Sequence, residues 1–276
     1  MPAKKPGKLV TSPAGPVAAA PCPKAAGASP VDVTTITTKT ALVKSRIPGV
    51  DYVINPYLGC GHGCRYCYAV FMRRYARHHA GSPWGSFVEA KVNLPEVLAK
   101  ELARKKQPEE AFLSSVCDPY QPAELKYRLT RSCLEILGKF GWKVSILTRS
   151  PLVSRDLDLL KTLPAVSVGL SIPTDDDQVR RVLEPHAPPI PARIATLKKL
   201  HDASLSPWVF IAPMLPLNPA RLHKLIAPYA SRIMMDPLNY RSQVSQVFRS
   251  HGWDYALTDT YAAKIREALR NLGNSA

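Results

Sequence analysis

The 276-residue sequence has no long hydrophobic run. None of its apolar stretches reaches the roughly 18 residues that a membrane-spanning helix needs, so we expect no membrane partner. The N-terminus is basic, but no compact apolar segment follows it, which argues against a secretory signal. The sequence therefore predicts a cytoplasmic protein.

Acidic side chains are scarce. Only 21 Asp plus Glu stand against 37 Lys plus Arg, which gives a formal net charge of +16. A charge of this sign and size favours an anionic partner, most often a nucleic acid. Part of the excess lies near the N-terminus, but many arginines are spread over the rest of the chain. DNA or another nucleic acid is therefore an expected partner.

Cysteine is also scarce, but three of the six cysteines lie in one window, Cys60-Gly-His-Gly-Cys64-Arg-Tyr-Cys67. The others, Cys22, Cys117 and Cys133, are scattered without pattern, which argues against a disulfide framework and fits a reducing compartment. Zinc is an alternative, although its sites usually have four ligands in paired Cys-x2-Cys groups. Three thiolates on one short loop instead suit three irons of a cubane cluster and leave the fourth iron open.

Short apolar strands alternate with helices through residues 41–240, which we expect to form the core. The expected strands are 52–55, 111–116, 142–147, 165–172, 207–212 and 232–235, and the expected helices are 69–77, 123–140, 154–162, 191–203 and 219–230. This alternation predicts an α/β fold of parallel βαβ units, either an open doubly wound sheet or a partial barrel.

The two ends of the chain have different patterns. Residues 1–40 are rich in Ala, Pro, Lys and Thr and show no strand or helix period, so they are expected to be a disordered tail. Residues 241–276 are expected to form a C-terminal helical extension.

Polar residues follow the predicted strands. Ser115, Cys117 and Asp118 follow the second strand, Arg149 follows the third, and Ser171 ends the fourth. Each of these side chains alone has an ordinary alternative role, such as capping a helix. In a parallel barrel, however, functional groups collect at the C-terminal ends of the strands, so their recurrence predicts a site there.

Four parts of the chain show a combined pattern between about residues 45 and 240. They are residues 55–69, residues 117–124, residues 147–156, and residues 169–174 together with 184–188. This pattern resembles the spore photoproduct lyase-like branch of the radical S-adenosylmethionine (SAM) superfamily. The resemblance implies a partial (β/α)6 barrel of TIM type. It also implies an enzyme that cleaves SAM with a 4Fe–4S cluster to a 5′-deoxyadenosyl radical, which abstracts hydrogen from a substrate.

The resemblance also implies which residues hold the cofactors. Cys60, Cys64 and Cys67 would ligate the cluster, and Arg149 would pair with the methionyl carboxylate of SAM. The remaining residues expected at the SAM site are Tyr66, Ser115, Asp118 and Ser171, with Tyr66 beside the adenine.

Further roles implied by the resemblance concern hydrogen transfer. Tyr66 and Tyr68 are candidates for passing a hydrogen atom back to the cofactor, with aromatic packing as the alternative. Cys117 is a candidate donor to the product radical, with a small buried hydrophobe as the alternative. A flavodoxin- or ferredoxin-type protein is expected to supply the electron.

The substrate stays open at this point. Lesion-bearing DNA, of the kind repaired by spore photoproduct lyase, is the preferred class. RNA, a peptide or a small metabolite is the alternative. A non-catalytic iron–sulfur protein that binds nucleic acid or acts as a sensor is the remaining interpretation.

Overall fold

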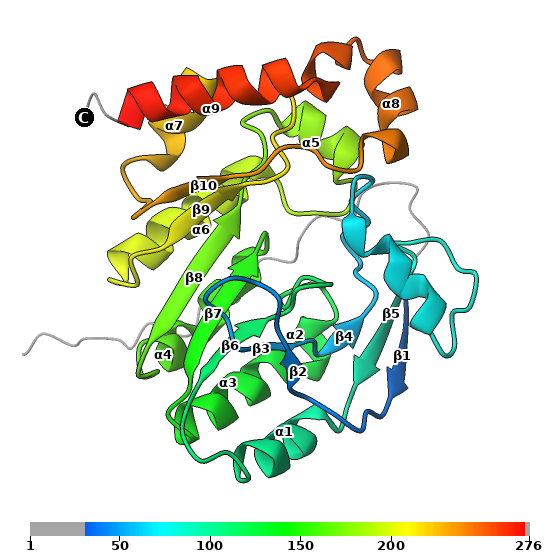
Figure 1. Ribbon diagram of the computed structural model, residues 1–276, viewed down its shortest axis with the longest axis vertical. Coiled ribbons are helices and arrows are strands. Elements are labelled where there is room, and N and C mark those ends of the chain that lie inside the picture. Colours follow the sequence, from blue (N-terminus) through cyan, green and yellow to red (C-terminus); the bar gives the residue numbers. More distant parts are fainter. Residues whose placement is uncertain (1–30, 274–276) are drawn as a thin grey trace, which may run out of the picture.

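The computed structural model describes residues 31–273, and its larger sheet has seven strands in the order β10-β9-β8-β7-β6-β3-β2 (Figure 1). Every pair from β3 to β10 is parallel, and β2 is antiparallel to β3 at one edge. The strands are β2 (Val43–Lys44), β3 (Tyr52–Ile54), β6 (Glu110–Leu113), β7 (Lys143–Thr148), β8 (Val166–Ser171), β9 (Trp208–Ile211) and β10 (Ile233–Met235). The predicted α/β fold with parallel strands in chain order, in a partial (β/α)6 arrangement, is confirmed.

Helices lie between these strands, and most of them bury their apolar faces in the main core. They are α1 (Leu94–Leu102), α2 (Glu124–Tyr127), α3 (Leu129–Lys139), α4 (Leu157–Leu160), α5 (Asp177–Leu183), α6 (Ile190–Asp202) and α7 (Pro219–Ile226). Leu98 of α1, Leu134 of α3 and Leu197 of α6 are fully buried in one cluster with residues of the sheet. In β6 and β7, buried residues alternate with partly exposed ones, so the helices cover one face of the sheet.

Neighbouring residues of one strand serve opposite faces of the sheet. Val209 and Ile211 of β9 are fully buried in the main core, whereas Trp208 and Phe210 line a cavity on the other face. This alternation follows from the two-residue period of a β-strand. One face of the sheet therefore carries the core and the other is free to carry a site.

Two predicted helices are divided in the structure. The predicted helix 123–140 breaks at Arg128, whose φ is 51°, and the side chain of Glu124 accepts a hydrogen bond at 3.0 Å from the backbone N–H of Thr130 at the start of α3. The predicted helix 154–162 consists of the 3₁₀ helix η2 (Pro151–Asp156) followed by α4. The predicted helix 69–77 is the 3₁₀ helix η1 (Tyr68–Tyr75), and helices α1 and α5 were not predicted.

A second sheet lies beside the first and corrects the predicted extent of the tail. Its order is β1 (Asp32–Ile36), β5 (Phe87–Lys91) and β4 (Tyr57–Leu58), visible at the right of Figure 1. Strand β1 lies inside the range predicted to be disordered, and it pairs in parallel with β5 from Asp32↔Phe87 to Ile36↔Lys91. Its partner lies about 55 residues further along, so no local period signals the strand. The rest of the predicted tail up to residue 30, including Cys22, lies outside the described residues.

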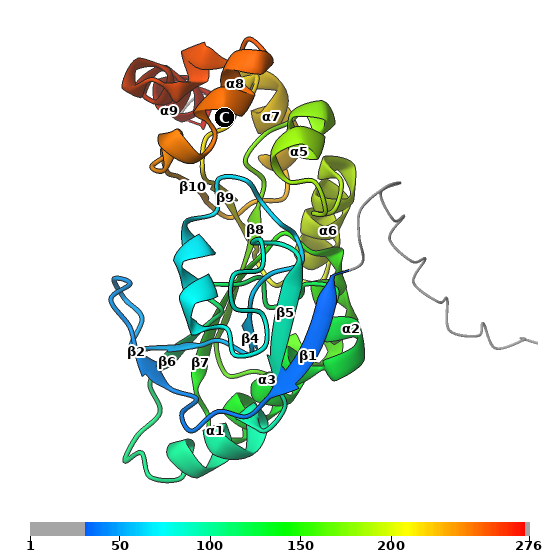
Figure 2. The same cartoon turned by 90° about the vertical axis from the view of Figure 1, so that its right-hand side faces the viewer.

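The C-terminal part is helical and packs near the cysteine window. It contains η3 (Arg241–Gln243), α8 (Ser245–Ser250), η4 (Asp254–Leu257) and α9 (Asp259–Gly273), shown in orange and red at the top of Figures 1 and 2. Val244 and Phe248 are fully buried in one apolar cluster with Cys64 and Tyr66. The C-terminal segment therefore helps to enclose the cysteine window. Among residues 31–273, no helix is both long and apolar enough to cross a membrane.

Candidate functional site

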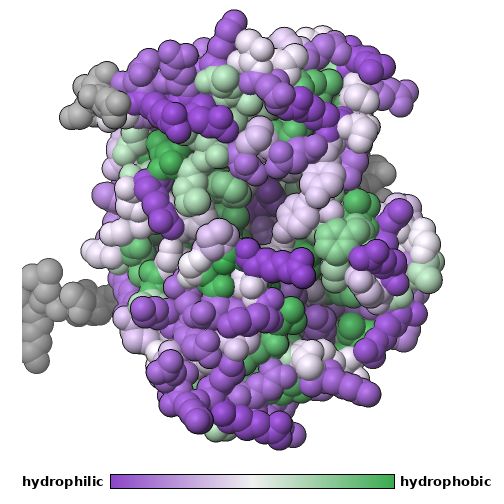
Figure 3. Space-filling model, viewed as in Figure 1, coloured by the Kyte–Doolittle hydropathy of each residue, from purple (hydrophilic) through white to green (hydrophobic). Residues whose placement is uncertain are grey.

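A cavity of about 390 Å³ lies between the cysteine window and the C-terminal ends of the parallel strands. Figure 3 shows the face of the molecule that is hollowed near its centre. All ten residues that the sequence analysis proposed for the site line this cavity: Cys60, Cys64, Tyr66, Cys67, Tyr68, Ser115, Cys117, Asp118, Arg149 and Ser171. The fold therefore brings the cysteine window and the polar strand ends to one place.

The cysteine window is bent by its glycines and held by one buried amide. Gly59 and Gly63 have φ of 86° and 59°, which residues with a Cβ rarely adopt. The side chain of Gln121, fully buried, accepts a hydrogen bond from the Gly61 N–H at 2.8 Å and donates one to the Gly59 carbonyl at 3.2 Å. Gln121 thus fixes the backbone that precedes Cys64.

Replacing Gly59 with alanine is expected to disrupt this loop. A Cβ at Gly59 would lie 2.5 Å from the carbonyl oxygen of Phe87, in addition to the unfavourable positive φ. We expect a loss of at least about 2 kcal/mol of unfolding free energy, measured by urea denaturation.

Gly61→Ala is the matched control two residues away. Its Cβ would have only ordinary contacts, the nearest at 3.5 Å, and its φ is not positive. A change within about 1 kcal/mol is expected. Equal losses in the two variants would contradict this account of the loop.

The three thiols of the window are buried or half-buried and are not in disulfides. Burial raises the pKa of Cys64 to about 12, against the lowering effect of Arg149. Burial likewise raises the pKa of Cys60 well above its usual value. Such thiols need a strongly cationic group nearby to become thiolates, and a metal ion or cluster is such a group.

The three thiols lie around one cavity. Within residues 31–273, no three His, Cys, Asp or Glu side chains converge on a point that would hold one metal ion. A cubane cluster places each thiolate on a separate iron. The three thiols on this loop line one cavity, which suits such a cluster.

Asp118 joins the cysteine window to the end of β7. Its carboxylate accepts hydrogen bonds from Thr148 Oγ1 at 2.6 Å and from the Arg149 N–H at 2.9 Å, and it lies 3.4 Å from His62 Nε2. Burial by itself would raise the pKa of Asp118, but the contact with His62, the charge of Arg149 and the bond from Thr148 lower it. An ionised Asp118 therefore holds the end of β7, and its carboxylate lies beside His62 of the loop, a residue to which the sequence analysis assigned no role.

Arg149 lies at the centre of a second buried network. Its Nη2 donates a hydrogen bond to Ser171 Oγ at 3.2 Å, and its Nε lies 3.4 Å from Glu184 Oε1. The Nε is buried and makes no hydrogen bond within the described part of the chain. A guanidinium at a cavity wall, held in place by Glu184 and Ser171, fits an incoming carboxylate.

Glu184 links Arg149 to the cysteine window. It is fully buried and accepts hydrogen bonds from Tyr66 Oη and from the buried Arg193. Burial raises the pKa of Glu184, but the charges of Arg193 and Arg149 outweigh this effect and lower it. Glu184 lies in a segment used for the family resemblance, yet its contact with Tyr66 spans 118 residues, so sequence spacing gave no sign of it.

Two of the hydrogen-transfer candidates, Tyr68 and Cys117, are connected through Ser115. The Tyr68 hydroxyl donates a hydrogen bond to the carbonyl of Ser115, two residues before Cys117. The thiol of Cys117 lies 3.4 Å from the carbonyl of Tyr57, and burial raises its pKa to about 11. Cys117 is therefore a protonated thiol at neutral pH, and this is the form that carries a transferable hydrogen atom.

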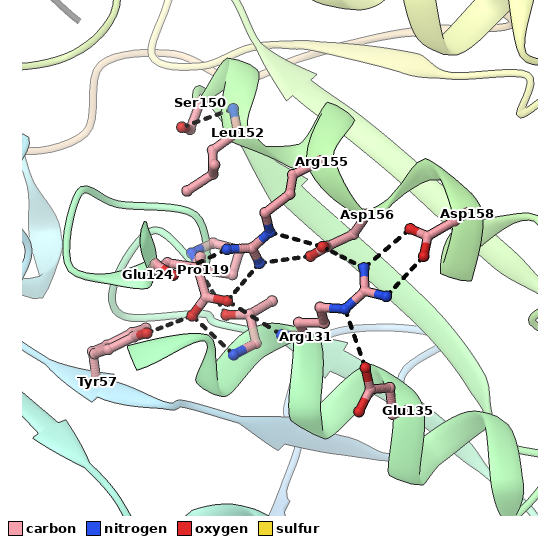
Figure 4. A network of polar contacts seen from close by, with 11 residues as sticks. Tyr57, Pro119, Glu124, Arg131, Glu135, Ser150, Leu152, Arg155, Asp156 and Asp158 are labelled. Carbon is pink, nitrogen blue, oxygen red and sulfur yellow. Dashed lines mark hydrogen bonds and ion pairs between the residues drawn. The ribbon is translucent and has the colours of Figure 1, made fainter. Parts of the chain in front are cut away.

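Behind the cavity, a buried polar network supports the strand ends (Figure 4). Glu124, fully buried, accepts hydrogen bonds from Tyr57 Oη and from Arg155 Nη2, the latter at 2.8 Å. Arg155 and Arg131 both pair with the buried Asp156, with distances of 2.8 and 2.9 Å. Segments 117–124 and 147–156 thus also hold strand β4 and helices α2 and η2 in place around the site.

Several aromatic cavity residues were missed in the sequence because they come from unrelated elements. They are Trp84, Trp208, Phe210 and Tyr240. One signal was present: Gly169 lies opposite the Trp208 ring, and a Cβ there would approach the ring to 2.4 Å. A glycine inside a strand indicates such a close approach.

Comparisons with known proteins identify the family of this chain. The family model of the radical SAM superfamily matches residues 54–227. An uncharacterized protein of Methanocaldococcus jannaschii is 37% identical over 188 residues, which cover 68% of this chain and 70% of the relative. An uncharacterized protein of Mycobacterium tuberculosis is 36% identical over 170 residues, which cover 60% of this chain. The chain spans only 50% of that mycobacterial relative.

Solved structures of low sequence identity share the fold. A point mutant of spore photoproduct lyase gives a TM-score of 0.58 at 16% identity, covering 87% of this chain and 77% of the lyase chain. A lyase mutant with bound AdoMet and dinucleoside spore photoproduct gives 0.52 at 19% identity, covering 71% and 56%. Streptococcus suis SuiB bound to S-adenosylmethionine gives 0.50 at 13% identity, covering 81% and 48%.

The family model covers more than half of the chain, including strands β6 to β9 and the cysteine window. Radical SAM proteins use a 4Fe–4S cluster and SAM, and the cavity described above offers donor groups suited to both. This chain belongs to the radical SAM superfamily.

Proposed function

We propose that Cys60, Cys64 and Cys67 hold the 4Fe–4S cluster and that the adjoining cavity binds SAM and a nucleic-acid substrate. The observation that carries this proposal is the meeting of the three thiols, Arg149 and Ser171 around one cavity. When bound and reduced, the cluster supplies the electron that cleaves SAM and starts hydrogen abstraction from the substrate.

The chain's own residues bind and orient SAM. The guanidinium of Arg149 at the cavity wall receives the methionyl carboxylate, and Ser171, which accepts a hydrogen bond from Nη2, contacts the amino-acid or ribose part. Glu184 holds Arg149 in position and ties it to Tyr66, which flanks the adenine. Trp208 and Phe210 form an apolar wall that excludes water from the reacting atoms.

Hydrogen-atom transfer to and from the substrate is assigned to Cys117 and to the tyrosines of the loop. Cys117 lines the cavity as a protonated thiol and donates a hydrogen atom to the product radical. Tyr68, 44% exposed and hydrogen-bonded near Cys117, would return a hydrogen atom to the thiyl radical left on Cys117 and regain one from 5′-deoxyadenosine, with Tyr66 deeper in the site.

A nucleic-acid lesion is the substrate class that the chain supports best. The net charge of +16 favours a polyanion, and a lyase of the same fold is known with a bound dinucleoside spore photoproduct. Adduct reversal of this type is therefore our concrete proposal, with a flavodoxin- or ferredoxin-type donor in the cytoplasm as the electron source.

The test is anaerobic reconstitution with iron and sulfide, reduction with dithionite, and chromatography for 5′-deoxyadenosine. Deoxyadenosine formation, together with repair of UV-irradiated DNA, is the expected result. An intact cluster with no deoxyadenosine under any condition would overturn the enzymatic proposal. If irradiated DNA neither changed the amount of deoxyadenosine formed nor was repaired, the proposed substrate class would be wrong.

Cys117→Ala separates hydrogen return from SAM cleavage. The variant should keep its cluster and its deoxyadenosine formation, because Cys117 is not one of the three clustered thiols. Formation of the repaired product should fall at least about tenfold, equivalent to about 1.4 kcal/mol in the activation barrier. Chromatography of both products from one reaction checks this, and unchanged repair would remove Cys117 from the mechanism.

A further inference from the structure

Helix η1, which begins at the mouth of the cavity, exposes aromatic rings and arginines together. Phe71 and Tyr75 are 44% and 54% exposed. The guanidinium of Arg74 lies 5.6 Å from the centroid of the Phe71 ring and 4.9 Å from that of Tyr75. In a 3₁₀ helix residues three apart are eclipsed, so Tyr68, Phe71 and Arg74 share one edge of η1.

The arginines of this segment are not neutralised. Arg73, Arg74 and Arg77 are exposed, and within residues 31–273 none of them forms an ion pair with a carboxylate. On another side of the cavity, exposed Arg46 precedes Ile47, which lines the cavity and is 39% exposed. Unpaired positive charge thus lies beside the cavity mouth.

The mouth itself is flanked by two stacked tyrosines. Tyr68 and Tyr240 both line the cavity, both are about half exposed, and their ring centroids are 6.5 Å apart at an interplanar angle of 22°. Tyr68 is the first residue of η1. The exposed rings of Phe71 and Tyr75 therefore lie on the helix that begins at the cavity mouth.

We infer that η1 is a docking surface for single-stranded nucleic acid, with the exposed rings stacking on bases and the arginines contacting phosphates. Aromatic platforms combined with unpaired cations are the features by which proteins hold single strands. A base inside a duplex cannot reach an enclosed cavity, whereas an unpaired base can pass between the mouth residues. This inference rests on the proposed function in one respect: the bound nucleic-acid strand would lead to the same cavity.

The test uses the full-length reconstituted protein and fluorescence anisotropy with a fluorescein-labelled oligothymidylate. Tyr75→Ala should weaken binding by about tenfold through lost stacking, and Tyr75→Phe should restore it. Arg73→Ala and Arg77→Ala should each make the dependence of log affinity on log salt shallower by about 0.7. A duplex of the same length should bind more weakly than the single strand.

Matched controls lie on other elements. Tyr255 on η4 is 54% exposed, as Tyr75 is, and Arg270 is exposed on α9. Helix α9 lies at the top of Figures 1 and 2, away from the cyan segment that contains η1. Tyr255→Ala and Arg270→Ala should bind the oligonucleotide as the unchanged protein does.

Three results would overturn the inference. The first is equal oligonucleotide binding by the η1 variants and the controls. The second is binding of the duplex as tight as that of the single strand. The third is binding of a labelled polyglutamate peptide that is tighter than that of the oligonucleotide and is abolished by the same substitutions. The binding assay needs no SAM turnover. A protein that binds the oligonucleotide as described but never forms deoxyadenosine would refute the proposed function and leave the docking surface intact.

Discussion

Replacing Cys64 with alanine is expected to reduce 5′-deoxyadenosine formation to background. Cys64 is buried in the cysteine window and lines the cavity beside Arg149. With two thiolates left on the loop, no fixed third ligand is available for the cluster. The measurements are iron and sulfide content, the visible absorption of the reconstituted protein, and chromatography of the reaction with dithionite.

Cys133→Ala provides the control for removing a buried thiol. Cys133 is fully buried in the main core on α3 and does not line the cavity. Its loss should cost about 1 kcal/mol of unfolding free energy and leave iron content and turnover unchanged. Normal deoxyadenosine formation by Cys64→Ala would refute the assignment of the cluster to this loop.

Glu184→Gln is expected to have the second large effect, on both stability and SAM binding. The substitution removes the negative charge that compensates Arg193, which is fully buried, and Arg149, whose side chain is 18% exposed. Breaking a buried ion pair by removing one partner typically costs about 3–5 kcal/mol. Urea unfolding followed by circular dichroism should show this loss, and equilibrium dialysis should show weaker SAM binding.

Glu135→Gln is the matched control for the loss of a glutamate charge. Glu135 is 46% exposed and pairs with Arg131 one helical turn away. Exposed pairs of this kind contribute about 0.5 kcal/mol or less. If the two variants were equally stable, the network around Glu184 would not be the support that its burial indicates.

The same carboxylate predicts how stability depends on pH. The folded-state pKa of Glu184 lies below its ordinary value of 4.5 because Arg193 and Arg149 outweigh the effect of burial. Its contribution is therefore fully present above that ordinary pKa and is lost as pH falls through the folded-state pKa. Between neutral pH and pH 3, the unchanged protein should lose more unfolding free energy than Glu184→Gln. Parallel pH profiles of the two proteins would contradict this.

Much of the site was predictable because its signals are local in the chain. The Cys-x3-Cys-x2-Cys spacing places three thiols on one loop whatever the rest of the fold does. Ser115, Asp118, Arg149 and Ser171 were identified because each ends or follows an apolar strand, and parallel strands bring such ends to one edge. The structure confirms that these positions meet at one cavity.

The sequence did not predict features that depend on partners distant in the chain or on the detailed conformation of a turn. Strand β1 exists through its pairing with β5, and its short β-branched run alone does not distinguish it from the tail. The helix breaks at Arg128, where the buried side chain of Glu124 accepts a hydrogen bond from the backbone N–H of Thr130. Helical propensity around residue 128 carries no sign of that contact.

The sequence by itself determined the type of chemistry, the alternation of strands and helices and most of the polar groups at the strand ends, because these depend on residue type and short spacing. Only the tertiary structure decided which groups hold the others in place. Glu184 reaches Tyr66 across 118 residues, and Gln121 reaches Gly59 across 62. Such contacts are selected by the packing of the whole chain, since a buried charge or amide is stable only where the fold supplies its partners.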